Sequence, residues 1–222
     1  SKFTKKVIDK EYGVDSVVLY PPVATDLYKP KRKANQICYV SRFSNLTQNK
    51  GHEVLINEFK KLAKNKKFED WKLILAGGSE VGATEYLKKL KIMSSGYNIE
   101  FFESPSVEVL KDVFGKSKIF WSGAGFEEDE IKNPERVEHF GITLVESMSA
   151  GCVPVVYKAG GPKEIIDDGK NGFLWQNKNE LVTITKRLVN ESGILRNMSK
   201  EAVDLSKKYG YEEFKREVIK II

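Results

Sequence analysis

The sequence is poor in the residues that build metal centres and disulfide frameworks. It has two cysteines, Cys38 and Cys152, and two histidines, His52 and His139, among 222 residues. Neither pair has the spacing of zinc ligands, and no His-Glu-x-x-His or Asp-x-Asp motif is present. We therefore expect no bound metal. Because each cysteine lies in an apolar run, the sequence predicts buried free thiols in a reducing compartment.

Long hydrophobic runs are also missing. No run approaches the roughly 18 apolar residues of a membrane-spanning helix, and the N-terminus shows no signal-peptide pattern. The chain begins at Ser1 instead of a methionine, which suggests a cut inside a longer protein. A length of 222 residues corresponds to one large domain, or to one domain with an appendage.

Charge is abundant and shifted to the basic side. Charged residues make up 31% of the chain, and 37 Lys and Arg stand against 31 Asp and Glu, a surplus of six. Such a surplus suits nucleic acid, an acidic membrane surface or a phosphorylated ligand. Most lysines, such as the groups within 60–67 and 88–91, lie in helical patterns with few aromatics. This pattern indicates solvated helix faces and disfavours a nucleic-acid-binding module.

Short apolar runs alternate with amphipathic stretches along most of the chain. The strand candidates are residues 16–20, 36–40, 71–76, 99–102, 119–121, 153–157 and 172–175. Helical spacing marks 51–64 and 107–114, and three consecutive helices are expected over 180–189, 192–208 and 211–222. The alternation predicts an α/β fold, a Rossmann-like doubly wound parallel sheet with extra C-terminal helices.

Two segments break the alternation. Residues 20–35 contain three prolines and a basic run, which is typical of an extended connector. Residues 122–139 contain two glycines and the acidic run from Glu127 to Glu130, which is better interpreted as an exposed loop than as a calcium site. A long irregular segment directly after a strand is often functional, and ligands of doubly wound sheets bind beyond the carboxyl ends of the strands.

One motif is misleading. Gly115-Lys116-Ser117 imitates the end of a phosphate-binding P-loop, but the first glycine of that motif should stand where Leu110 lies. The tripeptide also follows a predicted helix instead of a strand. A helix end is therefore the better interpretation.

The most informative pair of residues is Glu138 and Glu146, two carboxylates eight positions apart. Glu138 precedes Gly141 at the mouth of a loop, and Glu146 lies inside the helix that begins near Gly141 or Ile142. Free N–H groups at such a helix start bind phosphate, and a glutamate about one turn further can accept hydrogen bonds from two vicinal hydroxyls. From the spacing alone, a surface helix residue and an ordinary cap remain the simpler interpretation.

Basic and glycine-rich groups follow other strand candidates. Arg42 and Lys50-Gly51 come after the strand at 36–40, where a guanidinium and an ammonium suit phosphate oxygens. Gly77-Gly78 closes the next strand, where glycine lets a ligand approach the backbone or lets the chain turn. Glu164 either faces a cleft or starts a helix. Each of these signals is weak by itself.

Taken in order, these elements resemble the donor-binding half of retaining glycosyltransferases of family 4, which have the GT-B architecture. The Glu-x7-Glu motif of that family matches Glu138 and Glu146 with the inner Phe-Gly-Ile, and its Arg…Lys-Gly pair matches Arg42 and Lys50-Gly51. Further matching segments are 1–4, 20–23, 150–156, 160–164, 168–174 and 211–214. The Glu-His-Phe-Gly-Ile form is similar to that of mannosyltransferases that extend lipid-linked oligosaccharides.

The resemblance implies roles for the charged residues. Arg42 and Lys50 would neutralise the diphosphate of a UDP- or GDP-sugar and assist its departure. Glu146 would bind the ribose hydroxyls, and Glu138 would contact hydroxyls of the transferred sugar. The catalytic residues implied are therefore Glu138, Arg42 and Lys50.

The resemblance also implies contacts beside the phosphates and the base. The phosphates would be held near the start of the helix, and the base would lie near the ends of two strands. The residues implied are Phe140, Gly141, Ile142, Thr143, Gly78 and Ser104.

At the level of the whole protein, the resemblance implies retaining hexose transfer without a metal or a cofactor. The expected partners are a nucleotide-sugar, an N-terminal acceptor domain that precedes Ser1, and a glycan or lipid-linked acceptor, but not nucleic acid. Residues 1–205 would form the nucleotide-sugar-binding domain, with 1–35 as the entry segment, and 206–222 a helix on the missing domain. We expect a cytoplasmic location, including the cytoplasmic face of a membrane.

Two departures and two alternatives accompany this resemblance. Ser41 stands where the family usually has glycine, and the segment 123–137 is longer than typical. A GT-B sugar-nucleotide epimerase would have the same fold, and a basic nucleic-acid-binding module is the alternative from another class. We expect the isolated chain to bind nucleotide and to transfer little or no sugar.

Overall fold

The computed structural model describes residues 1–44, 46–79 and 83–221, and within them six strands form one parallel sheet. The strands are β1 (Gln36–Val40), β2 (Lys72–Gly77), β3 (Ile99–Glu103), β4 (Ile119–Ser122), β5 (Val153–Tyr157) and β6 (Phe173–Trp175). Their order is β3-β2-β1-β4-β5-β6, and every neighbouring pair is parallel. The predicted doubly wound parallel sheet is confirmed.

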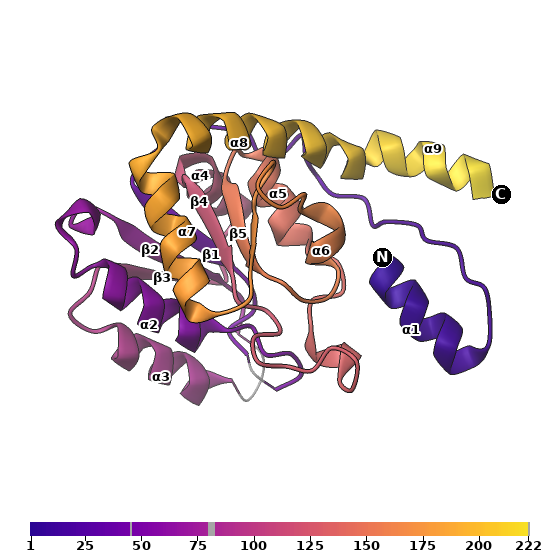
Figure 1. Ribbon diagram of the computed structural model, residues 1–222, viewed down its shortest axis with the longest axis horizontal. Coiled ribbons are helices and arrows are strands. Elements are labelled where there is room, and N and C mark those ends of the chain that lie inside the picture. Colours follow the sequence, from indigo (N-terminus) through magenta and orange to yellow (C-terminus); the bar gives the residue numbers. More distant parts are fainter. Residues whose placement is uncertain (45, 80–82, 222) are drawn as a thin grey trace.

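Helices connect the strands and cover both faces of the sheet (Figure 1). They are α2 (His52–Leu62), α3 (Thr84–Ser94), α4 (Val107–Lys116), α5 (Ile142–Ser149), α6 (Pro162–Ile165), α7 (Lys178–Asn190) and α8 (Ser192–Ser206). The chain moves outward from β1 to β3 and then returns to β4 on the other side of β1. Because parallel crossovers are right-handed, this reversal places α2 and α3 on one face and α4 and α5 on the other.

The strands form because they are nearly continuous apolar runs, as expected for a sheet that is covered on both faces. Every residue of β1 and β4 is buried. Trp121 and Trp175 are fully buried, and each indole N–H has an acceptor, Thr185 Oγ1 at 3.1 Å and Ser122 O at 3.2 Å, respectively. Cys38 and Cys152 are buried and free, which confirms the prediction for the thiols.

The N-terminal segment differs from the prediction. Residues 16–20 are extended but pair with no strand, so the strand expected there is wrong, and the preceding residues form a helix, α1 (Lys2–Tyr12). An apolar run becomes a strand only beside a strand that can pair with it, and Figure 1 shows this segment running apart from the sheet. Ser1 caps the start of α1, and Gly13 in the left-handed conformation ends it.

The chain ends in a helix that projects from the sheet domain, α9 (Tyr211–Ile221). None of its described residues is buried, and Ile222, the last residue of the predicted helix, lies outside the described residues. The false P-loop is a helix end, since α4 ends at Lys116 and Ser117 Oγ donates to Val113 O. Across the described ranges, no helix combines the length and the apolar character needed to cross a bilayer.

Candidate functional site

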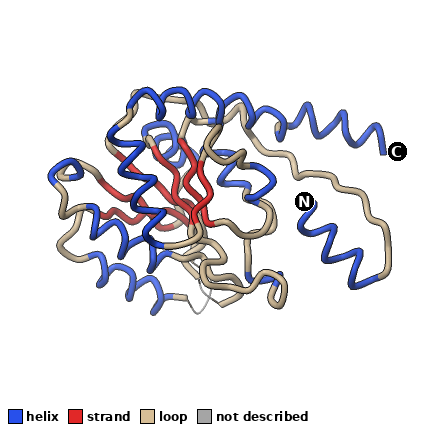
Figure 2. Tube along the Cα trace, viewed as in Figure 1, coloured by secondary structure: helices blue, strands red, loops and turns tan. Residues whose placement is uncertain are grey.

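The strand order reverses between β1 and β4, and this switch point brings the predicted residues together. Connections from two such strands lead in opposite directions, which leaves a crevice beyond their carboxyl ends. Figure 2 shows the loops that follow the strands gathered at one end of the sheet. Arg42 and Lys50 follow β1, Glu138 lies in the segment after β4, and Gly141 begins α5.

Lys50 and Glu138, which are 88 residues apart in the sequence, form an ion pair in this crevice. Lys50 Nζ lies 3.0 Å from Glu138 Oε2 and 2.6 Å from Gln48 Oε1. Only 7% of Lys50 is exposed, whereas Glu138 is half-buried. The structure therefore unites the basic element and the first glutamate of the Glu-x7-Glu motif in one cluster.

The start of α2 is held against the loop after β4 by two glycines. Gly51 has φ +69°, the left-handed conformation, and a Cβ atom there would lie 2.3 Å from the carbonyl oxygen of Gly123. Glycine is required at position 51 for both reasons. The contact fixes Lys50, the preceding residue, beside the segment that carries Glu138.

The segment from Ser122 to His139 is anchored through its acidic residues. Glu130 accepts from Gly160 N at 2.8 Å and pairs with Lys163, and Glu128 lies 2.9 Å from Arg136 Nε. Val137 is fully buried, and Glu138 O accepts from Gly161 N at 2.8 Å. The acidic run therefore braces the loop against the start of α6 and fixes the backbone beside Glu138.

The start of α5 faces a small cavity at the switch point. Gly141 is the N-cap residue of the helix, with φ +108°, and it has no side chain that could cap the helix. The cavity has a volume of about 20 Å³ and is lined by Glu138, Gly141 and Thr143 with the hydroxyl residues Ser41 and Ser122. Uncapped N–H groups at a helix start carry partial positive charge and suit an anion. Ile142 is exposed beside this site.

Glu146 lies one turn into α5 and is half-buried. Its carboxylate makes no hydrogen bond or ion pair with the residues that the structure describes. Burial raises the pKa of Glu146 to about 7. A desolvated carboxyl group without a partner, next to a phosphate-type site, is a feature of binding sites.

The other predicted residues lie at the ends of β1, β2 and β3. Phe43 N donates to Gly78 O at 2.8 Å, which holds the exposed Arg42 beside the end of β2. Ser104 has φ +46°, and its N–H donates to Gly77 O at 2.8 Å. The region predicted to receive a base is therefore a continuous edge of strand ends.

Two predicted residues have roles in packing. Phe140 is buried against Tyr20 and Tyr209, with ring centroids at 5.7 and 5.4 Å. Glu164 accepts from the N–H groups of Lys2 and Phe3 at 2.8 and 2.6 Å and from the Tyr20 hydroxyl at 2.8 Å. It therefore caps α1, a role that the sequence analysis did not consider.

His52 and Gln48 also contact this cluster, although no motif in the sequence marks them. His52 follows Lys50-Gly51 and is buried, and its Nε2 lies 3.0 Å from the Oγ of Ser41, the residue before Arg42. This contact links the end of β1 to the start of α2. Burial, with a smaller effect from Lys50, lowers the pKa of His52 to about 3, and the ring stays neutral. The available signal was Ser41, which stands where the family usually has glycine.

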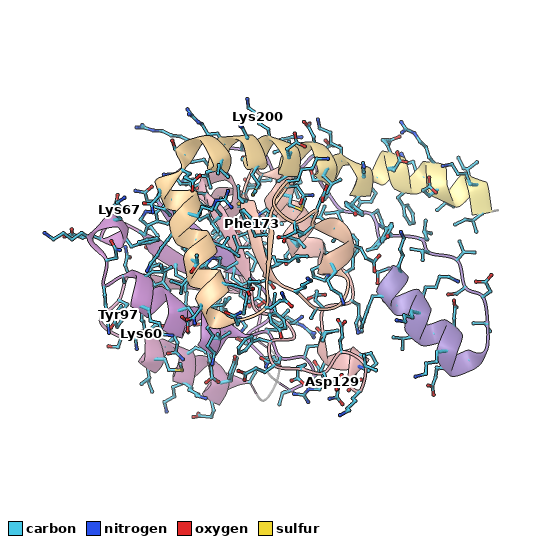
Figure 3. The ribbon with its side chains drawn as sticks, in the orientation of Figure 1. Lys60, Lys67, Tyr97, Asp129, Phe173 and Lys200 are labelled. Carbon is cyan, nitrogen blue, oxygen red and sulfur yellow. The ribbon has the colours of Figure 1, made fainter. Side chains whose placement is uncertain are left out.

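Most basic residues lie outside this site. Figure 3 shows Lys200 pointing away from the molecule, and Lys60 beside the ring of Tyr97, with its ammonium 4.9 Å from the ring centroid. The exposed Lys67 donates to Asn190 Oδ1 at 2.8 Å. Many lysines pair with nearby surface carboxylates, such as Lys89 of α3 with Glu53 of α2 at 2.7 Å. The basic surplus is therefore spread over solvated helices, as the sequence predicts.

Comparison with known proteins identifies relatives over most of the chain. The family model described as "Glycosyl transferases group 1" matches residues 27–204. A GDP-Man:Man(3)GlcNAc(2)-PP-Dol alpha-1,2-mannosyltransferase of Dictyostelium discoideum is 25% identical over 96% of this chain and 43% of its own length. An uncharacterized glycosyltransferase of Methanocaldococcus jannaschii is 24% identical over 96% of this chain and 55% of its own length. The chain thus spans about half the length of these curated relatives.

Solved structures share the fold. HepE of Anabaena in complex with UDP and glucose has a TM-score of 0.81 and 19% identity, and the match covers 100% of this chain and 61% of that chain. The C-terminal domain of LpcC, a group 1 glycosyl transferase of Francisella tularensis, has a TM-score of 0.66 and 20% identity, covering 85% and 99%. The second match spans nearly the whole of an isolated C-terminal domain.

Proposed function

The chain belongs to the group 1 glycosyl transferases, and we propose that it is the nucleotide-sugar donor-binding domain of a retaining, metal-independent hexosyltransferase. The observation that carries this proposal is the cluster at the switch point, where Lys50 and Glu138 pair at 3.0 Å beside the uncapped start of α5. Positive charge and helix N–H groups suit a diphosphate, and carboxylates suit the hydroxyls on either side of it.

In this proposal the diphosphate lies between Arg42 and Lys50 on one side and the start of α5 on the other. Lys50 supplies a point charge, Arg42 supplies a fork of donors, and the N–H groups near Gly141, Ile142 and Thr143 complete the site. As the bond to the transferred sugar breaks, negative charge grows on the diphosphate, and fixed positive groups stabilise that charge most in the transition state. Arg42 and Lys50 thus assist departure of the leaving group.

The two glutamates bind the groups on either side of the diphosphate. Glu146 accepts hydrogen bonds from the two ribose hydroxyls, which supply the donors that its carboxylate lacks among the described residues. Glu138 accepts a hydrogen bond from a hydroxyl of the transferred hexose while its Oε2 stays paired with Lys50. The base lies along the strand ends at Gly78 and Ser104.

The proposed donor is a UDP- or GDP-sugar, and the proposed acceptor is a glycan or a lipid-linked glycan. The similarity to HepE in complex with UDP and glucose supports the first nucleotide. The similarity to a GDP-Man mannosyltransferase acting on a PP-Dol acceptor supports the second nucleotide and a lipid-linked acceptor. We propose that residues 1–205, together with the buried Ser206 and Tyr209, form the donor domain, and that the rest of 206–222 packs on a further domain that supplies the acceptor site.

Titration with UDP and GDP tests the proposal. We expect one of the two to bind the isolated chain, and Arg42→Ala to weaken that binding by about 1–3 kcal/mol, the scale of a hydrogen bond to a charged group. Little or no sugar transfer is expected, because the acceptor site lies elsewhere.

Arg196→Ala is the matched control for this titration. Arg196 is an exposed arginine that lines a groove with Lys118 and Gly151, at the opposite, amino ends of β4 and β5. The control should bind as the unmodified chain does. Absence of binding of both nucleotides at millimolar concentration would refute the proposal.

A further inference from the structure

We propose that Gln48 is a positioning residue that holds Lys50 and Glu138 in one geometry for a diphosphate. This inference rests on the proposed function, and it assigns a role to a neutral side chain that lies between the two charged elements of the site. Gln48 does not reach the ligand itself; it acts through Lys50 and through the backbone next to Glu138.

Both ends of the Gln48 amide are engaged. Its Oε1 accepts from Lys50 Nζ at 2.6 Å, and its Nε2 donates to Val137 O at 2.9 Å. A primary amide offers an acceptor and a donor at the same tip, so one side chain can link a cation to a carbonyl oxygen. Gln48 therefore connects the loop after β1 to the segment after β4.

The far end of this connection is a rigid anchor. Val137 is fully buried, and hypothetical Cβ atoms at Gly125 and Gly160 would lie 2.9 and 3.0 Å from its methyl carbons. The next carbonyl, that of Glu138, accepts from Gly161 N at 2.8 Å. With the carbonyls of both residues held, the Glu138 side chain is fixed on the side of Lys50.

A neutral acceptor suits the end of the Gln48 amide that contacts Lys50. The Lys50 ammonium has three donor protons, and the residues that the structure describes occupy two positions around it, Gln48 Oε1 and Glu138 Oε2. The amide oxygen directs the ammonium without cancelling its charge, which leaves the third donor and the field of the cation for a phosphate oxygen. A second carboxylate at position 48 would instead give the cluster a net negative charge.

Two variants of the chain test this role by titration with the nucleotide that the unmodified chain binds and with its nucleoside. Gln48→Leu removes both hydrogen bonds and should weaken diphosphate binding about tenfold, the scale of losing one guiding hydrogen bond. Gln48→Glu keeps the shape and the acceptor for Lys50, loses the donor to Val137 O and adds charge, and should weaken diphosphate binding further. The extra loss in Gln48→Glu should shrink at high salt, because charge repulsion is screened.

The nucleoside is the readout that separates positioning from a structural role. Positioning of Lys50 affects only the phosphate contribution, so nucleoside affinity should stay unchanged in both variants. Gln176→Leu, the same change at an exposed glutamine, should leave both affinities unchanged. Thermal melting establishes that each variant is folded, and the isosteric Gln48→Glu carries the test if Gln48→Leu does not fold.

The outcomes distinguish this inference from the proposed function. Diphosphate binding equal to that of the unmodified chain in both Gln48 variants overturns the inference alone, and so does an equal loss for nucleoside and diphosphate. Failure of the unmodified chain to bind either nucleotide overturns the proposed function, and the inference falls with it.

Discussion

Glu146 is a residue whose burial costs stability at the site where we propose that it binds a ribose. Burial raises its pKa from 4.5 to about 7. Between these values the folded state keeps a proton that the unfolded state releases, so the free energy of unfolding falls as the pH rises from 4.5 to 7. The full difference corresponds to about 3 kcal/mol. We predict that Glu146→Gln is more stable than the unmodified chain at pH 8 by up to about that amount.

Urea unfolding at pH 5 and pH 8 measures this effect. The two proteins should differ little at pH 5, because Glu146 is then largely protonated in the folded state. Glu135→Gln, a change at an exposed position, should differ in stability from the unmodified chain by the same amount at both pH values. Nucleotide binding should weaken in Glu146→Gln because the amide replaces one of the two acceptor oxygens, one for each ribose hydroxyl, by an NH2 donor. A stability difference that is the same at both pH values would contradict the assignment.

The charged residues of the candidate site could be proposed from the sequence, whereas the neutral residues could not. Arg42, Lys50 and Glu138 are weak signals one by one, and the order of their motifs, which resembles that of a known family, singles them out. Gln48 and His52 carry no such signal, since an amide and a neutral imidazole act through partners that become neighbours only after folding. Their partners, Val137 and Ser41, belong to other segments of the chain.

At the scale of elements, the start of α2 depends on one glycine. Gly51 has φ +69°, and a side chain there would collide with the carbonyl oxygen of Gly123. We predict that Gly51→Ala lowers the free energy of unfolding by at least about 2 kcal/mol, from left-handed strain and displacement of the loop. Diphosphate binding should weaken as well, because Lys50 precedes the displaced turn.

Gly193→Ala is the matched control for this change. Gly193 lies in α8 with nothing within 4 Å of a Cβ atom, so alanine should raise stability by up to about 1 kcal/mol through helix propensity. Chemical denaturation of both variants measures the effects. Equal stability of Gly51→Ala and the unmodified chain would show that the α2 turn tolerates a side chain.

Strands and helices are predictable from the sequence where the residues that cause them are close together in the chain. The strands at 36–40 and 153–157 are runs of apolar residues buried on both faces, and their bounds were predicted. The segment at 16–20 has a similar composition, but it pairs with no strand among the described residues, and sequence patterns do not report pairing partners. Helix α1 has local end signals in Ser1 and Gly13, but its second cap, Glu164, is 161 positions from Phe3 and is visible only in the fold.

At the scale of the whole molecule, the sheet order decides where a ligand binds. The sequence predicts alternating elements, but the reversal between β1 and β4 is a property of the assembled sheet. That reversal explains why residues near positions 42–51 and 138–146 share one site while the lysines of α2 and α3 lie on an outer face. The resemblance to a family with the GT-B architecture assigned these two groups of residues to one ligand, which local patterns do not do.

The boundary of the sheet domain at its C-terminal end yields the last prediction. Tyr209 is buried against Phe140, whereas α9 has no buried residue among those described, and Ile219 is 77% exposed. Removing residues 211–222 should therefore lower the free energy of unfolding of this chain by less than about 1 kcal/mol, because little apolar surface is uncovered.

Removing residues 191–222 should abolish folding, because α8 contributes the buried Met198 and Ala202. Urea unfolding of the two truncated chains measures the difference. In the proposed two-domain protein, the shorter deletion should be costly, since the apolar face of α9 would then be covered. A loss of several kcal/mol on removing α9 from the isolated chain would instead place that helix within the sheet domain.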